Sequence, residues 1–221
     1  MVAKVLLLIE STNKCGVFIS MLFKMNFCFI FVVKKCNMIY LIRHAESVGN
    51  AGGRTASPSD NPLTEKGIRQ SVELLKRLPE KPDLIVVSPY IRARQTARPL
   101  IEKYPDVPVE VWNVQEYTYL DVERCKNTTK AERIVIAGEY IARNDPDYIH
   151  GRGAESFNQM LQRVDEMFDR LKNMDNGKRV ILFTHRQFMR AALARKNGNT
   201  VTFDDVFDGI DVDNTEIIEL Q

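Results

Sequence analysis

The sequence predicts an α/β fold, a three-layer sandwich whose mostly parallel sheet has helices on both faces and a small lid over the carboxyl ends of its strands. Three observations predict this class. Short continuous apolar runs recur along the chain, helical patterns lie between them, and capping or turn residues separate the two kinds of segment. This alternation is typical of βαβ units, which build parallel sheets.

The strands are predicted from the apolar runs. Residues 38–43 (MIYLIR), 84–88 (LIVVS) and 180–184 (VILFT) are nearly continuous in apolar, β-branched or aromatic residues, as expected for strands buried on both faces. Residues 214–220 (NTEIIEL) alternate in polarity and predict an edge strand, and residues 109–112 are a weaker candidate.

Capping residues and prolines mark the ends of two predicted helices. Thr64 can cap a helix that runs to about Leu78, where Pro79 stops it. Ser88 followed by Pro89 predicts a second helix start, because proline at the first helical position lacks only an N–H that would have no partner there.

Two further segments have helical patterns. Residues 156–173 place apolar side chains three and four positions apart, which predicts one core-facing stripe rather than a cofactor site. Residues 116–154 interrupt the strand–helix alternation and contain a helical run over 130–143. We interpret them as an insertion over one end of the sheet, where a substrate lid is expected.

The composition is that of a soluble globular protein, with 44% hydrophobic and 27% charged residues. A net charge of +2, from 31 basic and 29 acidic residues, argues against nucleic-acid binding by bulk charge. The cysteines show no Cys-x-x-Cys spacing, which indicates neither a disulfide framework nor a zinc site and predicts a cytoplasmic location. They are Cys15, Cys28, Cys36 and Cys125.

Residues 1–37 differ from the rest and are predicted to be an N-terminal extension. Residues 17–33 are largely apolar, but they are few for a membrane span and contain Lys24, which is costly inside a bilayer. Three interpretations are open: residues upstream of a working start at Met38, a membrane anchor, or a packed accessory element. Membrane contact is expected only under the second, and residues 38–221 are predicted to form one catalytic domain.

The chain has three histidines, and two of them directly follow buried-strand patterns. They are His44, in LIRHAES, and His185, in LFTHRQF. Because the carboxyl ends of parallel strands meet at one edge of the sheet, both histidines are expected to face one cleft. The third, His150, lies in the predicted lid and is a weaker candidate for substrate contact.

Arginines accompany these histidines. Arg43 directly precedes His44, and Arg92 lies beside the helix start predicted at Ser88. Guanidinium groups and helix N-termini both bind phosphate well. No acidic cluster with metal-ligand spacing accompanies them, and the sequence contains no P-loop and no Gly-x-Gly-x-x-Gly segment. The residues therefore predict a metal-independent phosphate pocket that needs no cofactor.

Six segments follow one another in a characteristic order from Met38 to Gln221: LIRHAES with Asn50 after it, DNPLTEKG (60–67), SPYIRARQTA (88–97), GAESF (153–157), FTHRQFMRA (183–191) and DNTEI (213–217). Taken together they resemble the histidine phosphatase superfamily, with its Arg-His-Gly signature, to which the phosphoglycerate mutases belong. The resemblance covers essentially the whole chain after residue 37, and it is specific because the blocks occur together.

The resemblance implies a role for each candidate residue. His44 would attack phosphorus and become a transient phosphohistidine, a step suited to a neutral imidazole. The phosphoryl oxygens would be bound by Arg43, Asn50, Arg92 and His185. Glu116, in NVQEYTY, would be the general acid that protonates the leaving group, although its surrounding motif is loose.

Two residues depart from the family pattern. Ala45 replaces the usual glycine after the first histidine, and Arg186 replaces the glycine that commonly follows the second. Arg186 could add a cation to the site or point to solvent, and we favour solvent slightly.

Three functions are open. The favoured one is a phosphomonoester hydrolase acting on a small phosphate ester or a phosphoprotein. A phosphoglycerate mutase-type enzyme is the second, but the residues after Glu116 lack the arginine and the glycine-rich lysine segment of the mutases. The third is a catalytically weak phosphate-binding regulatory module, which the intact set of site residues argues against. The sequence predicts neither the oligomeric state nor the physiological substrate.

Overall fold

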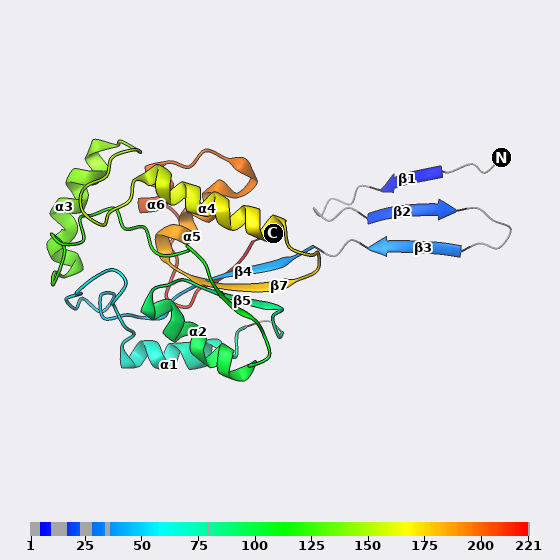
Figure 1. Cartoon of the computed structure of the whole chain (residues 1–221), viewed down its shortest axis with the longest axis horizontal. Coiled ribbons are helices and arrows are strands. Elements are labelled where there is room, and N and C mark those ends of the chain that lie inside the picture. The colour runs from blue at the N-terminus through cyan, green and yellow to red at the C-terminus, as the bar shows by residue number, and fades with distance from the viewer. Residues whose placement is uncertain (1–4, 10–16, 23–27, 34–35, 79, 221) are drawn as a thin grey trace.

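A five-stranded sheet forms the centre of the fold in the computed structural model, which describes residues 5–9, 17–22, 28–33, 36–78 and 80–220 (Figure 1). The strand order is β6-β5-β7-β4-β8; β8 is an antiparallel edge strand and the other pairings are parallel. The strands are β4 (Met38–Arg43), β5 (Leu84–Val87), β6 (Val109–Val111), β7 (Arg179–Thr184) and β8 (Ile217–Leu220). The predicted α/β class and mostly parallel sheet are confirmed.

Helices cover both faces of this sheet. In Figure 1, α1 and α2 lie on one side, and α4, α5 and α6 lie on the other. The helical segments are α1 (Glu65–Leu74), α2 (Ile91–Lys103), α3 (Lys130–Arg143), α4 (Phe157–Lys172), α5 (Arg186–Arg195), the 3-10 turn η1 (Lys196–Gly198) and α6 (Phe203–Phe207).

Two hydrophobic cores result, one on each face, because successive strand residues point to opposite sides. Leu41 and Leu182 pack in the core that contains α4 and α5, whereas Ile42 and Phe183 pack in the core of α1 and α2. All four side chains are fully buried, as expected for strands covered on both faces. This packing fixes the central strands, so their carboxyl ends form a rigid edge.

Helix α4 bears out its predicted amphipathic pattern. Ser156 caps it, accepting from the backbone N–H of Gln159, while the Gln159 side chain accepts from the Ser156 N–H in a capping box. The stripe of buried side chains along α4 consists of Phe157, Met160, Val164, Met167 and Leu171. Helix α3 coincides with the helical run expected inside the lid.

Two helix ends differ from the sequence-based expectation. Thr64 caps α1 as predicted, but the helix ends at Leu74, and turns follow it to Leu78. Helix α2 begins at Ile91, two residues beyond the proline-based start at Pro89. Tyr90 has an extended backbone conformation and is the N-cap residue of α2, without a side-chain capping bond.

The N-terminal extension contains a separate antiparallel sheet of β1 (Val5–Ile9), β2 (Val17–Leu22) and β3 (Cys28–Val33), drawn beside the larger sheet in Figure 1. In the described part of the chain, no helix has the length and apolar character needed to cross a membrane. Cys36 is disulfide-bonded, which the cysteine spacing did not indicate. The domain boundary after residue 37 and the cytoplasmic location stay predictions.

Candidate active site

His44 directly follows β4 and is 2% exposed. Its Nδ1 lies 2.7 Å from the carbonyl oxygen of Ala45, which can only accept, so Nδ1 carries the ring proton. The other ring nitrogen, Nε2, accepts a hydrogen bond of 3.1 Å from Nε of Arg92. Both contacts select the neutral tautomer in which Nε2 is unprotonated, which is the form that a nucleophilic histidine needs.

His185 lies beside it, because β4 and β7 are neighbours and end in register. The two imidazole rings have centroids 5.0 Å apart, which places both strand-end histidines in one site as predicted. The Nε2 atom of His185 lies 2.7 Å from the Ser88 hydroxyl, while its buried Nδ1 has no partner among the described residues. An unpaired buried nitrogen at this position points to a ligand.

Burial and positive charge act together on the two histidines. Burial is the largest cause that lowers the pKa of His44 well below its usual 6.5, followed by the charges of Arg92 and Arg43. Burial and the charge of Arg92 likewise lower the pKa of His185. Both rings are therefore neutral at neutral pH, and His44 is an available nucleophile there.

Two buried arginines complete the cationic side of the site. Arg92, in the first turn of α2, also donates from Nη1 to the Pro58 carbonyl at 2.6 Å. Arg43, the last residue of β4, donates from Nη1 to the Val212 carbonyl at 2.7 Å, and its buried Nε has no partner among the described residues. Burial and the neighbouring charge of Arg186 lower the pKa of Arg43 to about 10, so it stays charged at neutral pH.

Glu116 approaches the site from the segment after β6. Its Oε1 accepts hydrogen bonds from the backbone N–H of Tyr117 at 3.2 Å and from that of Gln187 at 3.0 Å. Gln187 lies in the first turn of α5. Both donors act on Oε1, so Oε2 has no partner within the described residues. A proton on this carboxyl group would therefore lie on Oε2.

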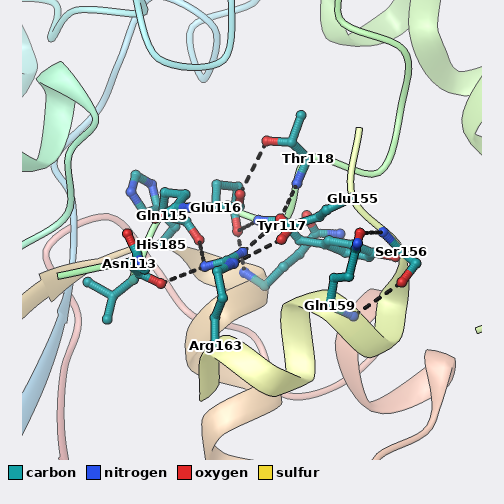
Figure 2. Close-up of polar contacts among 12 residues, drawn as sticks. Asn113, Gln115, Glu116, Tyr117, Thr118, Glu155, Ser156, Gln159, Arg163 and His185 are labelled. Carbon is teal, nitrogen blue, oxygen red and sulfur yellow. Dashed lines mark hydrogen bonds and ion pairs between the residues drawn. The ribbon is translucent and has the colours of Figure 1, made fainter. Parts of the chain in front are cut away.

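A partly buried ion pair holds the segment that carries Glu116 in place (Figure 2). Arg163 of α4 binds Glu155 through two hydrogen bonds of 2.8 and 2.7 Å, and the two side chains are 11% and 18% exposed. The same guanidinium donates to the carbonyls of Asn113 at 2.8 Å and Gln115 at 3.1 Å. On the far side of Glu116, Glu155 accepts from the Thr118 N–H at 3.1 Å. The backbone is thus fixed on both sides of Glu116.

Asn50 lies at the edge of the site, as predicted, and is exposed. Its Oδ1 accepts from the backbone N–H of Ser47 at 3.2 Å and from Nδ2 of Asn214 at 3.2 Å. The same Asn214 amide donates to the His44 carbonyl at 2.8 Å. These bonds tie the loop after His44 to the segment before β8.

A cavity of about 310 Å³ adjoins these residues. Its lining includes Arg92, Glu116, Asn50 and Gln187, and also Tyr117, Tyr119, Leu120, Val122, Arg133 and Ile134 among others. Arg43, His44 and His185 are not among the residues that line it. Across the described ranges, no group of three or more histidine, cysteine or acidic residues has an arrangement that could hold a metal ion. The arrangement suits an anion bound beside a neutral nucleophilic imidazole.

A family comparison agrees with this geometry. The family model for the histidine phosphatase superfamily (branch 1) matches residues 39–221. The chain belongs to the histidine phosphatase superfamily. The match covers all five strands of the central sheet apart from the first residue of β4.

Several members of this superfamily resemble the chain. It is 30% identical over 163 residues to a metal-independent phosphoserine phosphatase of Arabidopsis thaliana, covering 71% of this chain and 67% of that one. It is 29% identical over 168 residues to a 2,3-bisphosphoglycerate-dependent phosphoglycerate mutase of Gloeobacter violaceus, covering 71% and 74%. The crystal structure of the alpha-ribazole phosphatase from Shigella flexneri superposes with a TM-score of 0.61 at 26% identity, covering 74% and 81%.

The predicted family and phosphatase class are confirmed by these matches. The individual residue roles stay predictions, although the structure brings Arg43, His44, Arg92, Glu116 and His185 together at the edge formed by the carboxyl ends of the strands.

Two further residues of this histidine phosphatase had open roles. Arg186 is only partly exposed; it donates from Nε to the Val212 carbonyl at 3.1 Å and pairs with Asp211 at 3.3 Å. It therefore shares an acceptor with Arg43 and adds positive charge beside the site, in contrast to the favoured solvent orientation. His150 is not among the cavity-lining residues, and its Nδ1 accepts from the Asp121 N–H at 3.1 Å.

Sequence reasoning missed four functional neighbours: Ser88, Arg163, Gln187 and Asn214. Gln187 and Asn214 lie inside recognised sequence blocks, and their proximity to the histidines was a usable signal. Ser88 was interpreted only as a helix start. Arg163 lies on the polar side of an amphipathic helix, so its pattern indicated nothing beyond exposure to solvent.

Proposed function

We propose that the chain hydrolyses phosphomonoesters through a phosphohistidine on His44. The observation that supports this most directly is the neutral His44 ring, with its proton held on Nδ1 and its Nε2 beside Arg92. Arg43 and His185 each present one buried nitrogen without a partner in the described part of the chain, and a phosphoryl group would supply acceptors for both.

The proposed reaction has two displacements. The electron pair on Nε2 of His44 attacks phosphorus, and the bond from phosphorus to the ester oxygen breaks as Glu116 gives the leaving oxygen its proton. Water then attacks the phosphohistidine while the ionised Glu116 takes a proton from it, and the nitrogen–phosphorus bond breaks to restore His44. Arg43, Arg92 and His185 stabilise the charge on the phosphoryl oxygens in both transition states. No step needs a metal or another cofactor.

Residues 116–154 are proposed as the lid over the leaving group. They supply much of the cavity wall, including Tyr119 and Arg133. Hydrolysis is favoured over a mutase reaction because the residues after Glu116 read Tyr-Thr-Tyr-Leu-Asp and lack the mutase arginine and glycine-rich lysine segment. A small phosphate ester fits a cavity of this size; a phosphoprotein would have to present its phosphorylated residue there.

Turnover of p-nitrophenyl phosphate tests this function. We expect the purified protein to hydrolyse it in excess chelator as fast as in magnesium, because the charge on phosphorus is met by side chains. Adding 2,3-bisphosphoglycerate should not be required. Loss of activity in chelator would contradict the metal-free mechanism, cofactor-dependent isomerisation of phosphoglycerate would favour a mutase, and binding of phosphate without turnover would favour a regulatory module.

Replacing Arg163 with Met should slow the reaction by misplacing Glu116. The variant removes the bonds to Asn113 and Gln115, and a displacement of about 1 Å at a catalytic group can cost on the order of a hundredfold in rate. We expect kcat for an alkyl phosphate to fall by roughly ten- to a hundredfold, and that for p-nitrophenyl phosphate to fall much less.

Arg195→Met is the matched control for Arg163→Met. Like Arg163, Arg195 forms an ion pair through two hydrogen bonds, in this case with Asp165 of α4. It forms no hydrogen bond to the segment that carries Glu116 in the described part of the chain. Its removal should leave both rates near those of the unaltered protein. An equal loss with both leaving groups in Arg163→Met would indicate general destabilisation and contradict a positioning role.

A further inference from the structure

The cavity extends well beyond the phosphoryl site, and the part near α3 has its own chemical character. Its lining includes Arg92 and Glu116 from the site described above, together with Tyr119, Ile134 and Arg133 from the segment proposed as the lid. Because the proposed phosphoryl site is at His44, which Arg92 contacts, the alcohol part of the substrate would extend past Arg92 and Glu116 into this cavity. The residues around that space determine which alcohols fit.

Arg133 is a fixed cation in this wall. Its Nη1 donates to the Thr55 hydroxyl at 3.2 Å and to the carbonyl and hydroxyl of Thr128 at 3.1 and 3.0 Å. All of its hydrogen bonds use this one nitrogen, so Nε and Nη2 have no partner within the described residues. A guanidinium held by one corner presents its free edge with little further loss of conformational entropy on binding an anion.

No carboxylate neutralises Arg133. Arg92 and Arg133, the two cavity-lining arginines, both lack an acidic partner at ion-pair distance in the described part of the chain, whereas six arginines elsewhere have one. The adjacent acid, Glu132, is already paired with Arg54 at 2.6 Å and caps α3 through the Thr129 N–H. Lys130 also lines the cavity and adds a second positive charge on the same side.

Aromatic and apolar side chains also line the cavity, among them Tyr119, Leu120 and Val122. Tyr119 packs against Tyr117 and Tyr140 with ring centroids 5.3 and 5.1 Å away, which makes it a rigid wall. Burial is the largest cause that raises the pKa of the Tyr119 hydroxyl to about 12. The charge of Glu116 also raises this pKa, whereas the charge of Arg133 lowers it. Tyr119 is therefore within electrostatic range of both Glu116 and Arg133.

We propose that Arg133 determines specificity by binding a second anionic group on the substrate. The preferred substrate class is a phosphomonoester whose alcohol has an apolar or aromatic body and carries a carboxylate or similar anion at its far end. The phosphoryl group lies at His44 and Arg92, the apolar body lies along Tyr119, and the anion contacts the free edge of Arg133. This inference rests on the proposed phosphatase site for the orientation of the substrate.

Two non-hydrolysable probes of matched shape test this proposal. They are 4-carboxybenzylphosphonate and 4-carbamoylbenzylphosphonate, which differ mainly in the charge of the distal group. Calorimetric titration of the full chain should give a Kd about tenfold lower for the carboxylate probe, as a charge-assisted contact with a fixed guanidinium provides. Equal affinity for the two probes, or tighter binding of the amide, would overturn the proposal without any variant.

Three variants test which residue causes the preference for the carboxylate probe. Arg133→Gln should bind both probes with about equal affinity, and Arg133→Lys should keep part of the preference because the charge remains. Arg124→Gln is the matched control, since Arg124 is an exposed lid arginine outside the cavity lining. If Arg124→Gln also removed the preference, it would arise from net lid charge; if Arg133→Gln kept it, another residue would be responsible. Either result overturns the role of Arg133.

Turnover of p-nitrophenyl phosphate by the same preparations separates this inference from the proposed function. A carboxylate preference that depends on Arg133, in a protein without turnover, would support the anion site and contradict the phosphatase mechanism. Turnover without a preference for the carboxylate probe would support the phosphatase mechanism and contradict the anion site at Arg133.

Discussion

His44→Ala should abolish turnover and the covalent intermediate together. The imidazole whose unprotonated Nε2 would form the bond to phosphorus is lost. We expect kcat for p-nitrophenyl phosphate to fall by about 10⁴-fold or more, as when a covalent nucleophile is removed.

Mass spectrometry detects the intermediate directly. A phosphoramidate is labile in acid, so the protein should be mixed with substrate and quenched in denaturant at alkaline pH. The peptide that contains LIRHAES should gain one phosphoryl group in the unaltered protein and none in His44→Ala. His150→Ala is the control, since His150 lies outside the cavity lining, and it should label normally.

His185→Ala should transfer the phosphoryl group slowly but retain some labelling, since His185 supplies a hydrogen bond to the phosphoryl group and not the covalent bond to phosphorus. An adduct on His185, or a fully active His44→Ala protein, would contradict the assignment.

Glu116→Gln should slow the reaction most for substrates whose leaving group needs a proton. An alkyl phosphate leaves as a strongly basic alkoxide, so its kcat should fall by about 10²- to 10³-fold when the acid is removed. The anion of p-nitrophenol is already stable, so formation of the phosphohistidine from that ester should change little. Glutamine has the shape of glutamate, and its carbonyl oxygen can still accept the N–H groups of Tyr117 and Gln187.

The measurement is the dependence of the single-turnover rate on the pKa of the leaving alcohol, across a series of aryl and alkyl phosphates. The slope should be steeper in Glu116→Gln than in the unaltered protein. Glu123→Gln is the matched control, because Glu123 is an exposed acid of the lid outside the cavity lining. Identical slopes in Glu116→Gln and the unaltered protein would show that another group protonates the leaving oxygen.

The sequence by itself determined the sheet and the position of its chemistry. Short continuous apolar runs bounded by turn and capping residues predict strands covered on both faces. His44 and His185 directly follow two of these runs, which predicts that they share one edge of a parallel sheet. The positions of Arg43 and Arg92 are predictable for the same reason, because Arg43 is the last residue of a strand and Arg92 lies in the first turn of a helix. Capping is equally local, so Thr64 caps its helix as expected.

Tertiary structure alone decided how the catalytic side chains are held. Arg163 reaches Asn113 across 50 positions of sequence, Gln187 reaches Glu116 across 71, and His185 reaches Ser88 across 97. Such bonds leave no periodic signal, since a surface arginine and one that clamps a distant backbone segment look alike in an amphipathic helix. The same holds for Arg133: the sequence shows only a cation in the predicted lid, whereas the packed structure shows that Nη1 is held by hydrogen bonds while Nε and Nη2 have no partner in the described part of the chain. Local patterns determine strands and caps because these depend on neighbours in sequence, whereas the site depends on which distant groups the packed cores bring within hydrogen-bonding distance.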